Sequence, residues 1–322
     1  MQPERIKILY IAGWGRSGTT IIENILGQVP GFFPVGEIRY VWDRGFMQNR
    51  LCSCGMPFRE CDLWIKIVSE AFGSIENVDP HTLNALMEDQ SRTLRIFSYL
   101  CQSPESIMQS PETQKYLENL KKLYMAILKV TKCKVIIDSS KFPIYGALLN
   151  TIPEFDVHFV HVIRDPRAVA YSWSKPKLLP GTTRYMKTID PVESSLHWVV
   201  WNLVIEYIGK HKAKNYTRLL YEDFTDHPKE TMLKILANMG ESEHPFLPFI
   251  DNHTVELQSN HAVSGNPDRF KLGKVLITPD NRWEKDMRLS AKYLVTLITM
   301  LFFPRYGYKL SLGKNQLSSG SK

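Results

Sequence analysis

The stretch Ile6–Thr20, IKILYIAGWGRSGTT, decides the fold. Its first half, Ile6–Ala12, is short and almost continuously apolar, which is typical of a buried parallel strand. Gly13 and Gly18 then have the spacing of a loop that holds a nucleoside triphosphate. Such a loop carries a lysine directly after its last glycine, and Thr19 occupies that position here. The stretch therefore predicts a strand, a phosphate-binding turn and a helix, with another cation in place of the lysine.

The turn at Gly18 is expected to direct several backbone N–H groups and the positive end of a helix toward one position. Arg16 can add a planar fork of donors that suits two phosphate-type oxygens, and Thr19 and Thr20 can donate hydroxyls from the first helical turn. A plain strand-to-helix turn needs none of these donors. The order of strand, glycine loop, arginine and paired threonines therefore predicts an anion site.

Further short apolar runs rich in β-branched residues predict more buried strands, at residues 133–138, 157–163 and 216–221, with another ending before Glu37. Helix-like stretches separate them, at Thr19–Val29, Pro80–Cys101, Gln114–Val130, Lys141–Asn150, Pro191–Lys210 and Glu230–Asn238. This alternation predicts an α/β protein with a P-loop-like central parallel sheet flanked by helices.

The region of about residues 44–130 contains no convincing strand. It is interpreted as a helical insertion between the second and third strands, of the kind that supplies a wall of a substrate pocket. No linker divides the chain, so a single domain over residues 1–312 is expected. The Ser/Gly/Lys-rich residues 313–322 are expected to form a flexible tail.

The net charge of +7, from 40 Lys and Arg against 33 Asp and Glu, favours acidic partners such as phosphate-bearing ligands. The sequence contains no basic block or aromatic-basic module of a nucleic-acid-binding protein. The apolar segment over residues 293–303 is shorter than the roughly 20 residues of a spanning helix. No leader is visible, so a soluble cytoplasmic protein is expected, or a lumenal one if an upstream anchor is missing. The oligomeric state stays open.

Three of the five cysteines, Cys52, Cys54 and Cys61, lie within one short stretch, CSCGMPFREC. A zinc site is conceivable there, but the stretch contains no histidine and a structural zinc site usually has four ligands. A local disulfide or packed free thiols is the favoured interpretation. The sequence does not decide the redox state of the cluster.

A second anion site is predicted where the strand over residues 157–163 ends. In VHVIRDPRAVAYSW, Arg164 follows the strand, Pro166 suits the first turn of a helix, and Ser172 lies about two turns along it. An arginine and a serine so placed can converge on a phosphate. Two anion sites at the carboxyl ends of parallel strands suggest one ligand with phosphates at both ends.

These motifs resemble those of sulfotransferases that use 3′-phosphoadenosine-5′-phosphosulfate (PAPS). GWGRSGTT resembles the 5′-phosphosulfate loop of that family and VIRDPRAVAYS its 3′-phosphate motif. YEDF at Tyr221–Phe224 resembles the end of a following strand, and SGNPDRF and NRWEKDM resemble the C-terminal segment that closes over the cofactor. The resemblance covers the chain from about residue 6 to Tyr308.

The resemblance implies cofactor-binding roles at both ends of PAPS, with adenosine 3′,5′-bisphosphate as the product and no metal required. The 5′ end would be held by Gly15, Arg16, Ser17, Gly18, Thr19 and Thr20. The 3′-phosphate would be held by Arg164 and Ser172, with Tyr221 near the nucleotide and with Gly265, Asn266 and Arg269 in the closing loop.

In PVGEIRYVW, Glu37 resembles the catalytic base of tyrosylprotein and some carbohydrate sulfotransferases. It would take the proton of an acceptor hydroxyl during in-line transfer of the sulfuryl group. The alternative is a Glu that caps a loop or pairs with Arg39. Lys141 resembles the lysine beside the leaving phosphate and would act there with Arg16. His158 and His161 are interpreted as structural, and His197 is a reserve candidate for the base.

Two other functions stay open at this point. Asp138 ends a predicted strand and could hold magnesium in a nucleotide or small-molecule kinase. A non-catalytic nucleotide-binding protein would bind the same ligands without Glu37. The acceptor is a hydroxyl of a carbohydrate, lipid, small metabolite or tyrosyl peptide. Aromatic residues near the insertion either line its pocket or belong to the core: Phe32, Phe33, Tyr40, Trp42 and Trp64.

Overall fold

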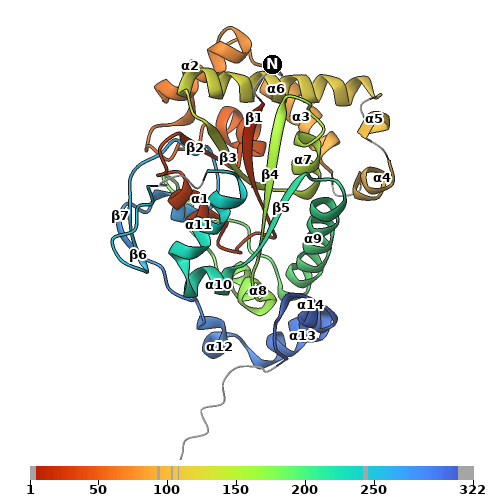
Figure 1. Cartoon of the computed structure of the whole chain (residues 1–322), viewed down its shortest axis with the longest axis vertical. Coiled ribbons are helices and arrows are strands. Elements are labelled where there is room, and N and C mark those ends of the chain that lie inside the picture. Colours follow the sequence, from red (N-terminus) through yellow and green to blue (C-terminus); the bar gives the residue numbers. More distant parts are fainter. Residues whose placement is uncertain (1–4, 93–94, 103, 108, 242–245, 311–322) are drawn as a thin grey trace, which may run out of the picture.

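The computed structural model describes residues 5–92, 95–102, 104–107, 109–241 and 246–310. At its centre is a parallel sheet in the order β2-β3-β1-β4-β5 (Figure 1). Its strands are β1 (Ile6–Ala12), β2 (Phe32–Gly36), β3 (Val135–Lys141), β4 (Phe155–Ile163) and β5 (Asn215–Leu220). Helices cover both faces of the sheet, which confirms the predicted α/β class.

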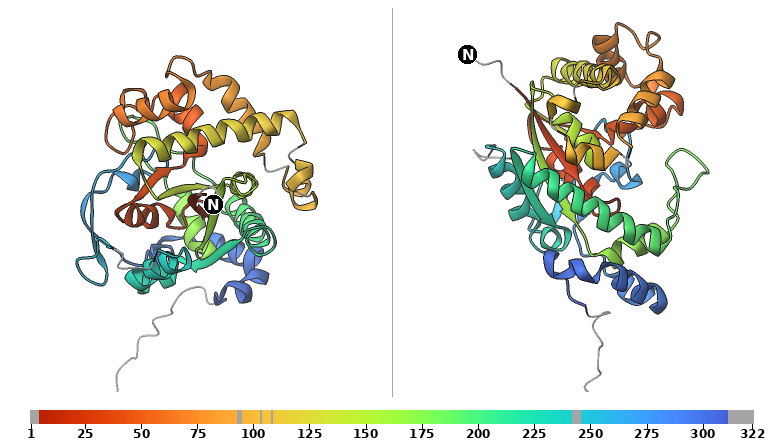
Figure 2. Two further views of the ribbon diagram at one scale, coloured as in Figure 1. Left: turned by 45° about the horizontal axis from the view of Figure 1, so that its top comes forward. Right: turned by 90° about the vertical axis from the view of Figure 1, so that its right-hand side faces the viewer.

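Alternate residues of β1 enter two different cores, because side chains of a strand point to opposite faces. Ile8 and Tyr10 pack with the helices α2 (Asp62–Phe72), α6 (Pro111–Thr131), α7 (Pro143–Leu149) and α9 (Pro191–His211). Leu9 and Ile11 pack with α1 (Thr19–Leu26) and α11 (Pro228–Asn238). The helices α9 and α11 accordingly lie on opposite sides of the sheet (Figure 2).

Between β2 and β3 the described residues form helices and short helical turns, which lie toward the top of Figure 1. They are η1 (Ile38–Tyr40), η2 (Val41–Met47), η3 (Phe58–Glu60), α2, α3 (Pro80–Gln90), α4 (Ile96–Cys101), α5 (Pro104–Ile107) and α6. The single helix predicted over Pro80–Cys101 is therefore interrupted. Ser91 lies at the end of α3, where its hydroxyl donates to the Met87 carbonyl and accepts from the buried Arg39 guanidinium. A serine bound in this way competes with helix continuation.

A second sheet, which no sequence pattern predicted, is the antiparallel pair of β6 (Thr254–Leu257) and β7 (Gly273–Leu276). Each strand has only four residues, too few for a recognisable alternating pattern. Val255 and Leu257 are buried in the core that α1 also enters. This hairpin holds residues 258–272, including η5 (Pro267–Phe270), beside α1.

The remaining helices are α8 (Pro166–Ser174), α10 (Tyr221–Asp226), α12 (Arg282–Asp286), α13 (Leu289–Thr299), η6 (Met300–Phe302) and α14 (Phe303–Tyr306). Within the described ranges, no helix has both the length and the apolar character needed to cross a lipid bilayer. The predicted tail at residues 313–322 lies outside the described residues.

The strand order places the functional motifs at one edge of the sheet. The chain runs from β1 to β2 on one side, returns through β3, and crosses to β4 on the other side of β1. Crevices form where the direction of winding changes, beyond the carboxyl ends of the strands. Ala12 of β1 is paired in register with Lys141 and His161 of the neighbouring strands. The segments that follow these strands therefore meet in one place.

Candidate active site

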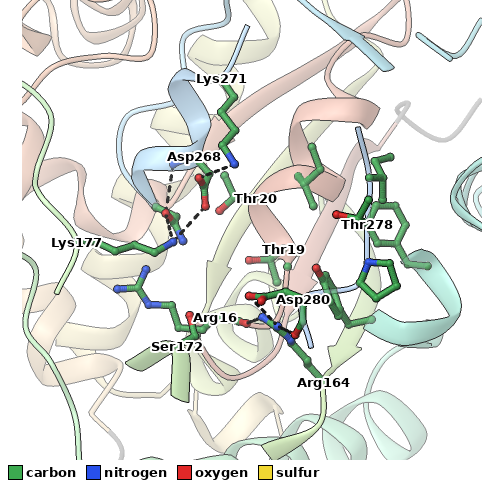
Figure 3. A pocket seen from close by; sticks show the side chains of 18 of the residues that line it. Arg16, Thr19, Thr20, Arg164, Ser172, Lys177, Asp268, Lys271, Thr278 and Asp280 are labelled. Atoms are coloured by element: carbon green, nitrogen blue, oxygen red, sulfur yellow. Dashed lines mark hydrogen bonds and ion pairs between the residues drawn. The ribbon is translucent and has the colours of Figure 1, made fainter. Parts of the chain in front are cut away.

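A cleft of about 700 Å³ lies at this edge of the sheet. It contains most of the residues that the sequence predicted for the site: Gly15, Arg16, Gly18, Thr19, Thr20, Glu37, Lys141, Arg164, Ser172, Tyr221 and Asn266. They come from segments that are far apart in the chain, and the parallel sheet brings them together. Figure 3 shows the residues of the loop and of the Arg164 motif around this cleft.

The glycine loop is shaped by close contacts that leave no space for larger side chains. Gly18 has a φ of 87°, and a Cβ there would lie 2.3 Å from the Tyr221 ring. Trp173 of α8 donates from Nε1 to the Gly15 carbonyl at 3.0 Å. Arg16 has a φ of 72°, a conformation that is strained for a side-chain-bearing residue and is common at functional sites. The loop is therefore held in one shape before any ligand is bound.

The helix α1 begins directly after this loop, and its first N–H groups have no side-chain cap. Thr19 and Thr20, in the first turn, line the cleft and are buried. Uncapped N–H groups at a helix N-terminus attract an anion through the helix dipole. Ser17 differs from its neighbours, because its hydroxyl donates to the Trp14 carbonyl at 2.7 Å and stabilises the loop itself.

Arg16 is a buried cation with no counter-ion in the described part of the chain. Its residue is 8% exposed, and among the described residues no carboxylate lies within ion-pair distance of it. Across the described ranges its Nε has no hydrogen-bond partner, and its Nη2 donates to the Met186 sulfur at 3.6 Å, while the guanidinium lies over the Trp173 ring at 4.8 Å. Burial lowers the pKa of Arg16, although Glu37 and Asp268 partly offset this effect. A buried charge of this kind is costly unless an anion binds to it.

Arg164 lies in the same cleft, directly after β4. Its guanidinium donates to the Arg16 carbonyl at 3.0 Å and forms an ion pair with Asp280 at 3.3 Å. It stacks over the Tyr221 ring at 4.4 Å, and its Nε has no hydrogen-bond partner within the described ranges. The chain turns immediately into α8, where Pro166 occupies the first turn and the Asp165 carboxylate accepts from the backbone of Arg167.

A second group of charges, missed by the sequence reasoning, lies away from Arg164 (Figure 3). Lys177 and Lys271 form ion pairs with the two oxygens of Asp268 at 3.2 and 3.0 Å. Thr19 and Thr20 lie between this group and the Arg164–Asp280 pair (Figure 3). Isolated lysines in a chain with 40 Lys and Arg give no local signal, because only the fold shows which of them face the cleft.

The charges of the cleft are unbalanced. In the part of the chain that the structure describes, six cationic side chains line it against three carboxylates. The cations are Arg16, Lys141, Arg164, Lys177, Lys271 and Arg282, and the carboxylates are Glu37, Asp268 and Asp280. The excess lies within one concave site, so fields from its members add. A small ligand with several negative charges fits this arrangement.

Glu37 follows β2 and is held by two cations. The Lys141 ammonium donates to Oε1, and Arg44 donates from Nη1 to Oε2 at 2.9 Å. Burial by itself would raise the pKa of Glu37, but the Lys141 and Arg44 charges and hydrogen bonds outweigh it, so the pKa is lowered. Glu37 is therefore an ionised carboxylate at neutral pH. Arg39, the partner that the sequence suggested, instead bonds Ser91 and Glu88.

The segment over residues 264–270, called the closing segment below, lies against Glu37. Gly36 has a φ of 74°, and a Cβ there would lie 2.6 Å from the Ser264 carbonyl oxygen. The backbone N–H of Glu37 donates to that same carbonyl at 3.2 Å, and the Ser264 hydroxyl accepts from Arg44 at 3.0 Å. Gly265 is next to Oε1 of Glu37, since its own Cβ would lie 3.8 Å away. Gly36 therefore permits the approach that joins the two segments.

Lys141 reaches Glu37 from the end of β3. Its φ of 71° departs from strand geometry, and the pairing of β1 with β3 shifts register between Tyr10 and Ala12. This turn of the backbone accompanies the placement of Lys141 in the cleft. A strained residue at a cation position is a common feature of functional sites.

Several sequence candidates lie elsewhere. The Arg269 guanidinium donates to the Leu51 and Ala262 carbonyls and the Ser53 hydroxyl, and Arg269 is not among the cleft residues. His197 stacks on Trp14 with ring centroids 4.7 Å apart, and its Nδ1 contacts the Glu193 carbonyl.

The side chains of two further histidines and an aspartate contact other protein groups and not the cleft. His161 is fully buried between Tyr216 and Asn202, and burial lowers its pKa to about 4. His158 contacts Asp156. The Asp138 carboxylate is buried and accepts from Ser140 and Tyr124, so its oxygens are already engaged. Of the aromatic candidates, Phe32, Trp42 and Trp64 are core residues, and none of the five lines the cleft.

Residues 9–245 match the model of the sulfotransferase family. The fold is similar to the sulfotransferase domain of the Synechococcus PCC 7002 olefin synthase, with 16% identity, 97% of this chain and 98% of that chain covered, and a TM-score of 0.47. A sulfotransferase from Mycobacterium avium has 14% identity, with 98% of this chain and 79% of that chain covered and a TM-score of 0.47. No curated protein matches the chain.

Proposed function

The chain belongs to the sulfotransferase family, and we propose that its sulfuryl donor is PAPS and that Glu37 is its catalytic base. The observation that carries the proposal is the pair of buried arginines, Arg16 and Arg164, each with an unpartnered Nε in the same cleft. Unpaired donors on buried cations are expected to donate hydrogen bonds to an anionic ligand. Two such positions fit a ligand that is anionic at both ends.

The proposed assignment divides the residues of the cleft between the two ends of the donor. Arg16, the N–H groups around Gly18, Thr19 and Thr20 would hold the 5′ end. Arg164 and Ser172 would hold the 3′-phosphate, with Tyr221 beside the nucleotide. Asn266 and Gly265 would close the side next to Glu37. Arg269 is left out of the proposed set, because its donors are already used on the backbone around Leu51 and Ala262.

When bound, PAPS supplies a sulfuryl group on a phosphate oxygen that is a good leaving group. Glu37 would accept the proton of the acceptor hydroxyl as the oxygen of that hydroxyl bonds to sulfur and the bond from sulfur to the phosphate oxygen breaks. Lys141 would leave Glu37 and, with Arg16, neutralise the charge on the phosphate oxygen that is released. This exchange frees the carboxylate when the donor is in place. Positioning and electrostatics then supply most of the rate enhancement, as in phosphoryl transfer.

The acceptor in this proposal is a hydroxyl compound, in keeping with the family, and no class of hydroxyl is preferred. A magnesium-dependent kinase is disfavoured, because the Asp138 oxygens that would hold the metal are engaged with Ser140 and Tyr124. A purely nucleotide-binding protein would have no use for a carboxylate held in the cleft by two cations.

Calorimetric titration with adenosine 3′,5′-bisphosphate and with ADP, each with and without magnesium, tests the donor. A charge-assisted contact from Arg164 is expected to contribute roughly 1.5 to 3 kcal/mol, which is about 10- to 150-fold in affinity. The bisphosphate should bind tighter than ADP by that factor without metal. Arg164→Ala should erase the preference, and Arg218→Ala, an exposed site on β5, should keep it. Equal affinities, or a requirement for magnesium, would reject PAPS as the donor.

A further inference from the structure

Four potential metal ligands from distant parts of the chain meet outside the cleft. They are the sulfurs of Cys52, Cys54 and Cys61 and a ring nitrogen of His261, and all four atoms lie within 4.8 Å of one another. None of these residues lines the cleft described above. The sequence showed three thiols in one stretch, and the fold adds the fourth ligand from a segment about 200 residues later.

Three of the six distances between these atoms are close to those of a tetrahedron around one ion. For zinc, ordinary bond lengths place two sulfurs about 3.8 Å apart and a sulfur and a nitrogen about 3.6 Å apart. Cys54 and Cys61 have their sulfurs 3.8 Å apart, and Nδ1 of His261 lies 3.8 Å from the Cys52 sulfur and 3.3 Å from that of Cys61. A disulfide would need two sulfurs at about 2 Å, and all the described cysteines are free.

We propose that Cys52, Cys54, Cys61 and His261 bind a structural zinc ion. Three thiolates and one imidazole are a common ligand set of closed, four-coordinate zinc sites, and soft sulfur ligands favour zinc over magnesium or calcium. Cys52 and Cys61 are buried, whereas Cys54 and His261 are partly exposed and leave a route for the ion. This site goes beyond the proposed transfer reaction and does not depend on it.

The charge of the surroundings is a second, independent observation. Three thiolates around a divalent ion carry a net charge of about −1. Arg269 is 7% exposed, and among the described residues no carboxylate lies within ion-pair distance of it. Its guanidinium donates to the carbonyls of Leu51 and Ala262, the residues directly before Cys52 and after His261. An anionic zinc centre supplies the counter-charge that this buried arginine lacks.

The backbone already holds the ligands in position. The N–H of Cys52 donates to the Met56 carbonyl, and the N–H of Gly55 donates to the Cys52 carbonyl, which closes a tight turn. Gly55 has a φ of 93°, a conformation that favours glycine. On the other side, Trp64 donates from Nε1 to the His261 carbonyl at 2.8 Å. The site is thus organised by contacts that do not involve its sulfurs.

The proposed ion would join the insertion to the closing segment. The backbone N–H of Ser53 donates to the Ala262 carbonyl at 3.0 Å. Two residues further on, Ser264 contacts Arg44 and the backbone of Glu37. Zinc at this junction would therefore fix the segment that adjoins the candidate base, without itself entering the cleft.

Metal analysis of the purified full chain tests the site. The protein is first freed of any histidine tag and dialysed. Inductively coupled plasma mass spectrometry should then find close to one zinc ion per chain. Cys54→Ser and His261→Ala should each lower the zinc content several-fold. Cys101→Ser, at an exposed cysteine outside the cluster, should leave it unchanged. Equal loss in the Cys101 variant would place the metal elsewhere and overturn the proposal.

Cobalt substitution of the wild-type chain keeps the test decisive if a variant fails to fold. Zinc removed by a chelator under reducing conditions should be replaceable by Co²⁺, with the intense visible bands of a tetrahedral ion and a thiolate-to-metal charge-transfer band. A spectrum of octahedral cobalt, no uptake of either metal by the reduced protein, or a Cys54–Cys61 disulfide in the freshly purified chain would each reject the site. Binding of adenosine 3′,5′-bisphosphate, measured separately, reports on the proposed function alone.

Discussion

The Lys141 ammonium donates a hydrogen bond to Oε1 of Glu37, so the two residues form an ion pair in the cleft. Their side chains are only 12% and 14% exposed, so solvent screens the pair weakly. Lys141, the proposed cation at the leaving group, therefore stays paired with Glu37, the proposed base, until another anion attracts it. A base that is freed only when the donor arrives would limit unproductive protonation of Glu37.

Glu37→Gln is expected to lower kcat by roughly 100- to 10,000-fold, because a general base contributes about that factor. Glutamine keeps the size of the side chain, so affinity for adenosine 3′,5′-bisphosphate should change by only a few-fold. Transfer of labelled sulfate to a hydroxyl acceptor measures the first quantity and calorimetry the second. Unchanged kcat would remove Glu37 from the proposal.

The acid limb of the pH profile should report the lowered pKa of Glu37. A base must be deprotonated to act, and a lowered pKa keeps it so as the pH falls, so kcat/KM should decline only below the ordinary range of a glutamate. Arg44→Gln removes one of the two cations that lower this pKa, and the acid limb should therefore move to higher pH. Arg218→Gln, at the exposed position of β5, is the matched control. If the acid limb of the Arg44 variant stays at the pH of the wild type, the limb reports the titration of a group other than Glu37.

Gly36→Ala should weaken the junction between Glu37 and the closing segment. The new Cβ would lie 2.6 Å from the Ser264 carbonyl oxygen, and the φ of 74° strains any side chain. Gly240→Ala is a matched control, since Gly240 has the same φ of 74° but no atom within 4 Å of its Cβ position. Both variants should lose stability by about 1 kcal/mol or more from strain. The Gly36 variant alone should also lose kcat, measured by sulfate transfer, and equal kcat in the two would contradict the junction.

Glu23 should make folding stability depend on pH. Burial raises its pKa from 4.5 to about 7, while hydrogen bonds from Ser139 and from the backbone of Gly36 act in the opposite direction. A raised folded-state pKa contributes stability that is fully present below 4.5 and is lost as the pH rises through about 7. Glu23→Gln removes this titration. Between about pH 5 and pH 8 the free energy of unfolding should fall in both proteins by different amounts. The fall should be about 2 to 3 kcal/mol smaller in the Glu23→Gln variant than in the wild type.

Urea unfolding at the two pH values measures the effect, and Glu118→Gln, at an exposed position of α6, should behave as the wild type does. The same dependence in the Glu23 variant and the wild type would assign the pH effect to other buried acids, of which Asp138 is one, since burial raises its pKa to about 6.

Much of the fold was predictable because its signals are local. Apolar runs predicted the strands of the main sheet. The turn residues of Gly13–Thr20 and of Arg164–Pro166 predicted two segments that contribute residues to the cleft. The interruption of the helix at Ser91 was missed because its cause is a contact with the distant Arg39. The β6–β7 pair was missed because its strands are too short to show a period.

By itself the sequence determined the strand, loop and helix of Ile6–Leu26, because neighbouring residues set backbone conformation and the end of a helix. Only the tertiary structure decided which cations reach Glu37, that Arg269 points away from the cleft, and that His261 completes the cysteine cluster. These arrangements join residues far apart in the chain. They depend on strand order and register, which bring together side chains that no local pattern connects.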